Sequence, residues 1–182
     1  ITMLNGYPLH NSGFTGNNVL IAVLDGGFMN ADLISSLAHL RNRKGIRHTF
    51  DFVNKSGYVY NSSTHGTAVL SILAGKADGY LAGTATGADY ILLKTEDIVS
   101  EYPCEEDFWV AGAEFADSLG ADIISSSLGY YNFDDPALNY KYSDLDGNTA
   151  FVTKAADIAA SKGILVVNSA GNERNKEWQR II

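Results

Sequence analysis

Three uninterrupted apolar segments constrain the fold of this chain more than any other feature of its sequence. They are Val19–Leu24, Tyr90–Leu93 and Ile164–Val167, and Asp122–Ser125 is a shorter fourth. Strands covered on one face alternate apolar and polar residues, whereas continuous runs rich in Val and Ile are typical of strands covered on both faces. The segments therefore predict a buried parallel sheet. The less apolar segment 46–53 is expected to form a more exposed strand.

The segments between these strands have helical periodicity. Glu105–Leu119 carries one apolar stripe and begins with acidic residues that favour the positive end of the helix dipole. Apolar residues surround most sides of Thr64–Ala74, which predicts a buried helix, and Thr149–Ser161 is a helix rich in Ala. Alternating strands and helices indicate an α/β fold, with a parallel sheet and helices on both faces. The stripe of the first helix consists of Phe108, Ala111, Phe115 and Leu119.

Composition narrows the class of protein. A length of 182 residues, of which 46% are hydrophobic and 19% charged, predicts one globular domain over residues 1–182. The formal net charge of −8 argues against nucleic acid as a partner. No apolar run approaches the ~18 residues that cross a bilayer, so no membrane partner is expected. The single cysteine, Cys104, excludes an internal disulfide and a CxxC site.

Two candidate functional residues lie at the ends of predicted elements, where α/β proteins collect their functional groups. Asp25 ends the first strand and is followed by Gly26 and Gly27, although Asp-Gly is also a common turn dipeptide. His65 begins the helix at 64–74, and Gly66 beside it leaves room for close approach to the imidazole. The alternative for His65 is a first-turn histidine bonded to a local carbonyl. No comparable setting surrounds His10, His39 or His48.

Two further segments follow predicted strands. Asn172 comes after the strand at 164–167, where a side-chain amide can donate to an oxyanion, an interaction that contributes ~2.7–4 kcal/mol in acyl transfer. The alternative is a plain turn at Gly171-Asn172. The segment 125–129 follows the strand at 122–125, and its backbone can face an extended peptide laid alongside as an added strand. The alternative there is a polar loop.

Together these four segments resemble the motifs of the subtilisin-like serine peptidases (subtilases, peptidase S8 type). The resemblance runs from about Gly13 to Glu173. It implies a serine endopeptidase that is secreted and acts on peptide or protein substrates. The motifs are VLDGGF (Val23–Phe28), STHGTAVLSILAG (Ser63–Gly75), ADIISSSLG (Ala121–Gly129) and GILVVNSAGNE (Gly163–Glu173).

The resemblance also assigns roles to residues of this chain. Asp25 orients and stabilises the imidazole of His65, His65 acts as general base and then general acid, and Asn172 donates to the oxyanion. The chain order Asp, His, then Ser is that of subtilisin rather than chymotrypsin. The pocket for the residue before the scissile bond is flanked by Ser127, Leu128, Gly129, Ser169, Ala170 and Gly171.

The nucleophilic serine does not occur in its expected setting. In the family it follows Gly-Thr at a helix start, but here Gly66-Thr67 and Gly83-Thr84 are both followed by Ala. We therefore expect an incomplete catalytic domain, truncated before the nucleophile and inactive alone. The chain does not begin with Met and has no signal-peptide pattern, which also suggests an excised or processed piece. An apolar face left uncovered by the truncation is expected to favour self-association.

Two alternatives differ in class from a peptidase. A non-catalytic peptide-binding or structural domain derived from such a peptidase would keep a groove at 127–129. A nucleotide-binding domain is disfavoured because neither GxGxxG nor GxxxxGK[ST] follows the first strand.

Some residues depart from the family pattern. Gly26 stands where Ser or Thr is usual, which removes a hydroxyl that helps to fix the aspartate, and Arg174 stands where Gly is common after Asn-Glu. The resemblance implies no required cofactor and no catalytic metal, but calcium is frequent in the family. Because no twelve-residue calcium loop is present, a solvated acidic loop is favoured over a structural calcium site. The acids concerned are Asp51, Asp134, Asp135, Asp144 and Asp146.

Overall fold

A five-stranded sheet with the strand order β2-β5-β1-β6-β7 forms the centre of the computed structural model, which describes residues 1–172. Every pair of neighbouring strands is parallel, as the continuous apolar segments predict. The strand predicted at 46–53 is present over Ile46–Asp51 at an edge of the sheet, and it is more exposed than β1, as predicted. The strands are β1 (Leu20–Asp25), β2 (Ile46–Asp51), β5 (Asp89–Lys94), β6 (Ile123–Ser126) and β7 (Leu165–Asn168).

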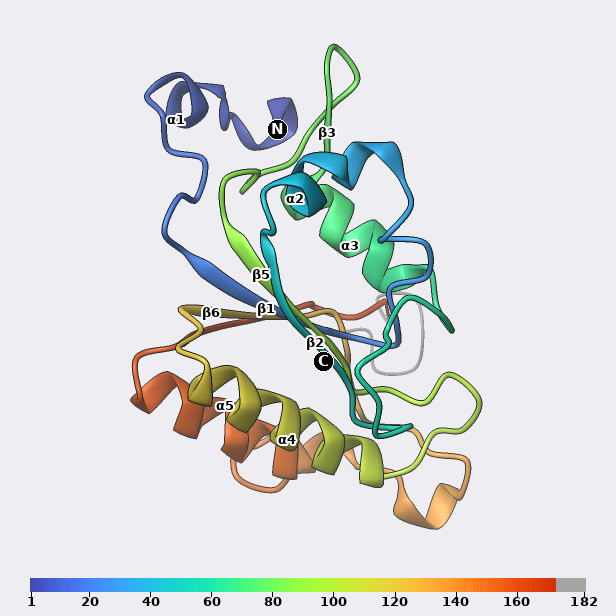
Figure 1. Ribbon diagram of the computed structural model, residues 1–182. Coiled ribbons are helices and arrows are strands. Elements are labelled where there is room, and N and C mark those ends of the chain that lie inside the picture. The colour runs from blue at the N-terminus through green and yellow to red at the C-terminus, as the bar shows by residue number, and fades with distance from the viewer. Residues whose placement is uncertain (173–182) are drawn as a thin grey trace.

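Helices cover both faces of this sheet (Figure 1). The helices α2 (Ala38–Asn42) and α3 (His65–Ala74) lie on one face, and α4 (Cys104–Ser118) and α5 (Phe151–Ser161) lie on the other. Side chains alternate along β1 between two hydrophobic clusters. Ala22 and Leu24 belong to the cluster under α4 and α5, whereas Ile21 and Val23 belong to the cluster under α2 and α3. The predicted α/β layering is confirmed.

The remaining elements are short. The N-terminal helix α1 (Tyr7–Asn11) and the hairpin of β3 (Lys76–Ala77) and β4 (Leu81–Ala82) lie beyond the amino ends of the strands (Figure 1). Among the described residues, no helix has the length and apolar character needed to cross a bilayer. Four 3₁₀ turns complete the elements described: Thr2–Leu4, Ser35–Leu37, Pro136–Leu138 and Tyr142–Asp144.

The buried face of α4 differs from the predicted stripe. Small residues turn toward the sheet: a Cβ added to Gly112 would lie 2.8 Å from Thr95 Cγ2. Phe115 of the predicted stripe is only partly buried and packs at the edge of the sheet, 6.1 Å from Phe50 of β2, ring centroid to ring centroid. Small side chains permit the closest approach of a helix to a sheet. The side of α4 that packs on the sheet is therefore the side that carries Gly112, not the predicted stripe. The buried apolar positions are Trp109, Gly112, Ala113 and Ala116.

The prediction that the helix at 64–74 is buried on most sides is wrong. Leu70 and Ala74 on one side of α3 are buried, but Ala68 is exposed and Ile72 is 64% exposed. The edge strand β7 is exposed on one face as well. Ile164 and Val166 belong to the α4–α5 side, so that Leu165 and Val167 point to the other face, where they are 59% and 48% exposed. Self-association through such apolar surface stays a prediction.

The acidic start of α4 is more buried than its place at the end of a helix suggests. Glu105 and Glu106 are only 1% and 2% exposed. The Glu106 carboxylate accepts hydrogen bonds from the Tyr140 hydroxyl at 2.6 Å and from the Val152 amide at 2.9 Å. Since Val152 lies in the first turn of α5, this one carboxylate joins both helices to the long loop between β6 and α5.

Candidate active site

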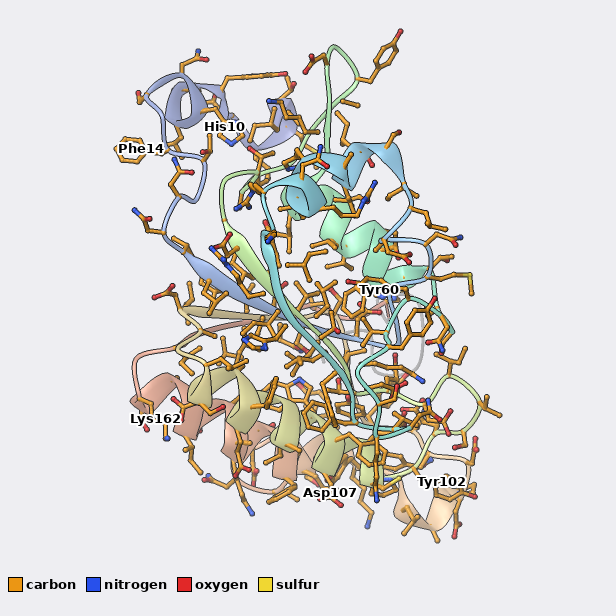
Figure 2. The ribbon with its side chains drawn as sticks, in the orientation of Figure 1. His10, Phe14, Tyr60, Tyr102, Asp107 and Lys162 are labelled. Atoms are coloured by element: carbon orange, nitrogen blue, oxygen red, sulfur yellow. The ribbon has the colours of Figure 1, made fainter. Side chains whose placement is uncertain are left out.

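The carboxyl ends of the strands meet at one edge of the sheet. The register pairs Asp25 of β1 with Lys94 of β5, and it pairs Ser126 of β6 with both Leu24 and Asn168. Figure 2 shows Tyr60 and Tyr102 at this end of the molecule and Lys162 at the opposite end. The predicted candidate residues that follow β1, β6 and β7 therefore share this edge.

The alternation of side chains along β1 turns the Asp25 side chain toward the beginning of α3. Ile21 and Val23 face the α3 side, and Asp25 follows them on the same side of β1. The helix α3 begins at His65, whose Nδ1 lies 2.8 Å from Asp25 Oδ2 and 3.0 Å from Oδ1. Asp25 is fully buried, whereas the His65 side chain is 56% exposed. The structure thus places a buried carboxylate behind an accessible imidazole.

Backbone groups hold this pair in place. The Gly26 amide donates to Asp25 Oδ1 at 2.8 Å, and the Gly66 amide also donates to this carboxylate. Gly66 has no room for a side chain, because an added Cβ would overlap the Gly27 carbonyl oxygen and lie 3.0 Å from Asp25 Cβ. At the helix start, the His65 amide donates to Ser63 Oγ at 3.0 Å, so Ser63 supplies the local acceptor.

The charges of the pair determine what it can do. Burial raises the pKa of Asp25, while the charge of His65 and the hydrogen bonds from His65, Gly26 and Gly66 oppose that rise. An ionised carboxylate only accepts hydrogen bonds, so it fixes the proton on His65 Nδ1 and leaves Nε2 as the free basic nitrogen. Among the described residues, no serine hydroxyl is hydrogen-bonded to the His65 ring.

The two segments predicted to bind substrate begin next to each other. The Ser169 amide donates to the Ser126 carbonyl at 2.9 Å, at the start of 127–129 and of 169–171. Leu128 and Gly129 line a cavity of about 230 Å³ whose wall includes Trp109. Ser127 is half-buried, while Ser169, Ala170 and Gly171 are exposed beyond β7 and do not line this cavity.

Asn172 is exposed in a bend that follows β7 and the left-handed Gly171, whose φ is 72°. Within residues 1–172, no hydrogen bond joins Asn172 to Asp25 or His65. The remainder of the motif, Glu173, and the departure from the family at Arg174 lie outside the described residues. The oxyanion role of Asn172 stays a prediction.

The acids considered as calcium ligands do not gather into one site. Asp51 binds Lys94 and Asn54, and Asp146 accepts from the amides of Asn148 and Thr149. The described residues contain no group of three or more His, Cys, Asp or Glu side chains placed to hold a metal ion. Within residues 1–172 the five acids therefore do not share one calcium site, and no step of the chemistry is assigned to a metal ion.

Glu96 is a neighbour of the pair that the sequence reasoning missed. Its carboxylate packs over Gly26, since an added Cβ there would lie 2.9 Å from Glu96 Oε2. Burial raises the pKa of Glu96 to about 7, with the charges of Glu101 and Asp25 adding to the rise and that of His65 opposing it. Its position in the sequence could have identified it, because Glu96 follows the strand predicted at 90–93, just as Asp25 ends the first strand.

The raised carboxyl pKa values predict that stability falls as pH rises. Burial raises the pKa of Glu105 to about 8, and the charges of Glu101 and Glu96 add to the rise. In the unfolded chain the pKa of a glutamate carboxyl is 4.5, so above pH 4.5 the folded protein binds more protons than the unfolded chain. The contribution of Glu96 and Glu105 to the stability of the folded protein is therefore complete only below that pH. This contribution is lost as pH passes through about 7 and 8.

Urea unfolding between about pH 5 and pH 8.5 measures this effect. Glu105→Gln mimics the protonated carboxyl, so its free energy of unfolding is expected to fall less with pH than that of the unchanged protein. Glu114→Gln, at an exposed position of the same helix, is the matched control and keeps the original slope. Equal slopes for the Glu105 variant and the unchanged protein would contradict the assignment.

Comparisons with known proteins give matches over most of the chain. A sequence model of the Subtilase family matches residues 16–180. Subtilisin E of Bacillus subtilis (strain 168) is 32% identical over 175 residues, which are 95% of this chain and 39% of that protein. Subtilisin of Bacillus pumilus is 31% identical over 175 residues, which are 95% of this chain and 54% of that protein. The chain spans less than two thirds of the length of these relatives.

Solved structures show the same fold. MycP1 with its N-terminal propeptide removed superposes with a TM-score of 0.66 at 22% identity, over 92% of this chain and 48% of that one. The prenylagaramide maturation protease PagA superposes with a TM-score of 0.61 at 19% identity, over 92% of this chain and 51% of that one. At these identities the likeness concerns the fold alone.

Proposed function

Because this chain belongs to the subtilase family, we propose that it supplies the Asp–His pair and the oxyanion donor of a serine endopeptidase. The observation that carries the proposal is the 2.8 Å contact between His65 Nδ1 and the fully buried Asp25 carboxylate. A buried acid behind an accessible imidazole is the arrangement that a general base of acyl transfer requires. Peptide or protein substrates follow from the same family membership.

In the proposed reaction, His65 Nε2 takes the proton of a serine hydroxyl as that oxygen attacks the peptide carbonyl. Asp25 stabilises the imidazolium that forms, and it stays ionised. Asn172 donates a hydrogen bond to the oxyanion, and the proton on Nε2 then passes to the leaving amine. The peptide lies as an added strand along 127–129, the segment that continues the chain beyond the carboxyl end of β6.

We place the serine of this triad in sequence outside these 182 residues. Neither Gly-Thr pair of the chain is followed by Ser, and the chain matches only 39% of the length of subtilisin E. His65 and Asp25 are therefore proposed to act together with a segment that the present sequence does not contain.

Labelling with a fluorophosphonate tests the proposal, because only an activated serine reacts with it. The chain of residues 1–182 alone is expected to remain unlabelled, and the protein that includes its downstream sequence is expected to be labelled at one serine. His65→Ala in that longer protein removes the label. A longer protein that stays unlabelled while binding peptides would instead support a non-catalytic peptide-binding domain.

Export from the cell is proposed on the family resemblance alone. A secretory signal encoded upstream of Ile1 supports it if found, and protein recovered from the culture medium measures it directly.

A further inference from the structure

The arginines of residues 1–172 are concentrated in one short segment of a chain that is acidic as a whole. The formal net charge of the chain is −8, yet the segment 41–47 contains three arginines, one lysine and no acid. This segment runs from the end of α2 into β2, which is the edge strand opposite β7. The surface beside β2 therefore has the opposite charge to the chain as a whole. The cations are Arg41, Arg43, Lys44 and Arg47.

An open cavity of about 540 Å³ lies against this segment. Three of the four cations line it, namely Arg41, Lys44 and Arg47, and Thr49 and Tyr60 lie beside them. The wall is accessible from outside, since Lys44 is exposed and the Arg47 side chain is 51% exposed. None of these residues belongs to the candidate active site, so the cavity beside β2 is a separate site.

Two of the lining cations have no carboxylate partner among the described residues. Arg41 donates three hydrogen bonds to backbone carbonyls of the segment 31–34, at distances between 2.9 and 3.3 Å. These bonds hold the guanidinium in place, but a carbonyl group does not neutralise its charge. Lys44 takes part in no ion pair within residues 1–172.

Asp89 is the acid that pairs with this segment, and it serves two arginines at once. It lies 2.5 Å from Arg43 and 2.5 Å from Arg47. Arg47 donates to it through Nε and Nη2, so the two N–H groups on Nη1 stay available to a ligand. Asp32 lies close enough for its charge to act on Tyr60, but it forms no ion pair within the described residues. The cations therefore outnumber the acids paired with them.

The hydroxyl of Tyr60 adds a neutral donor to the cavity. Burial raises the pKa of Tyr60, the charge of Asp32 adds to the rise, and the charge of Arg41 opposes it. Tyr60 thus keeps its proton at neutral pH and can donate a hydrogen bond. Its ring, labelled in Figure 2, packs edge-on against Tyr58 with the ring centroids 5.7 Å apart, which restricts its orientation.

The size and charge of the cavity favour a short acidic peptide over other anions. Cations spread over a wall of this size can each meet a separate carboxylate, whereas one small ion would meet only part of the wall. A nucleic acid or an anionic membrane would also face the acidic remainder of the chain. A short peptide meets only the charges within about 8–10 Å of the cavity, because salt screens the others.

We propose that the cavity beside β2 binds an acidic segment of a polypeptide, whose aspartate or glutamate carboxylates accept hydrogen bonds from Arg41, Lys44 and Arg47. The planar guanidinium of Arg47 suits a carboxylate, and the Lys44 ammonium contributes three further donors. The Tyr60 hydroxyl donates to the same segment. This binding site goes beyond the proposed peptidase function and does not depend on it.

Fluorescence anisotropy tests the proposal with the chain of residues 1–182. The probes are two rhodamine-labelled peptides of equal length, one with several Glu residues among Gly and Ser, and the other with Gln in place of every Glu. At low salt the Glu peptide is expected to bind about tenfold more tightly or better, and its Kd is expected to rise with salt. Equal Kd values for the two peptides overturn the proposal.

Variants locate the binding on the surface. Lys44→Gln/Arg47→Gln is expected to weaken binding of the Glu peptide about tenfold, because it removes two charged contacts. The matched control is Lys154→Gln/Lys162→Gln, which removes two exposed charges at α5, one of them also paired with an acid. Circular dichroism checks that both double variants fold. An unchanged Kd for the first variant, or an equal loss in the control, overturns the assignment to this cavity.

Inorganic phosphate separates a peptide site from a site for a compact anion. Phosphate is expected to displace the Glu peptide only at the ionic strength at which sodium chloride does so. Displacement at a much lower ionic strength would overturn the acidic peptide as the ligand. Fluorophosphonate labelling of the longer protein is measured independently, so the failure of one proposal leaves the other standing.

Discussion

Asp25→Asn, in the protein that includes the catalytic serine, is expected to lower kcat by about 10⁴-fold with little change in fold. Asp25 is fully buried and accepts a hydrogen bond from His65 Nδ1 at 2.8 Å. An asparagine amide would donate to that nitrogen instead, which moves the imidazole proton to Nε2. His65 then has no free nitrogen to take the serine proton. Steady-state hydrolysis of a peptide substrate measures the loss.

The control for this change is Asp78→Asn, at an exposed position of the β3–β4 hairpin that lies away from His65. It is expected to keep kcat within about twofold, as surface substitutions commonly do. Circular dichroism checks that both variants fold. A folded Asp25→Asn enzyme with kcat within tenfold of the unchanged enzyme would show that the pair does not carry the chemistry.

Gly66→Ala is expected to lower both stability and activity. The added methyl group would overlap the Gly27 carbonyl oxygen and lie 2.9 Å from the Phe28 ring. Because one neighbour is backbone, the start of α3 must move, at a cost of about 1–3 kcal/mol in the free energy of unfolding. His65 precedes Gly66 directly, and a shift of about 1 Å at a catalytic group lowers the rate by about 10²-fold. Urea unfolding and kcat/KM measure the two effects.

Gly57→Ala is the matched control, since an added Cβ at Gly57 meets nothing within 4 Å. Its stability is expected to be unchanged or slightly raised, because alanine reduces the conformational entropy of the unfolded chain. If Gly66→Ala were as stable and as active as Gly57→Ala, the close packing at the start of α3 would not position His65.

The strands and the approximate helix limits could be predicted from the sequence. Runs such as Val19–Leu24 and Tyr90–Leu93 bury both faces of a strand, so their composition alone reports their position in a parallel sheet. The contact of Asp25 with His65 was expected from the family motifs. The structure adds the local reason: alternation along β1 turns Asp25 to the α3 side.

The sequence was a poorer guide wherever packing partners come from elsewhere in the chain. In α4, helical spacing favours Phe108 and Phe115, but Gly112 and Ala113 are the buried residues, and Thr95 and Leu24 approach Gly112 closely. Glu105 and Glu106 have the composition of a solvated first turn, yet they are buried and bonded to Asp97 and Tyr140 of the loops that follow β5 and β6. The hydrophobic pattern of α4 alone does not indicate that those loops pack over it.

The sequence by itself determined the α/β class, the order of the strands along the chain and the residues Asp25 and His65. These depend on local properties, namely hydrophobic period, glycine at turns and motif identity. Only the tertiary structure decided that Gly26 accommodates Glu96 and that Glu105 and Tyr130 stay buried with unpaired oxygens. The reason is physical: the burial and charge of a side chain depend on the segments that pack around it, and folding brings those segments together from distant parts of the chain.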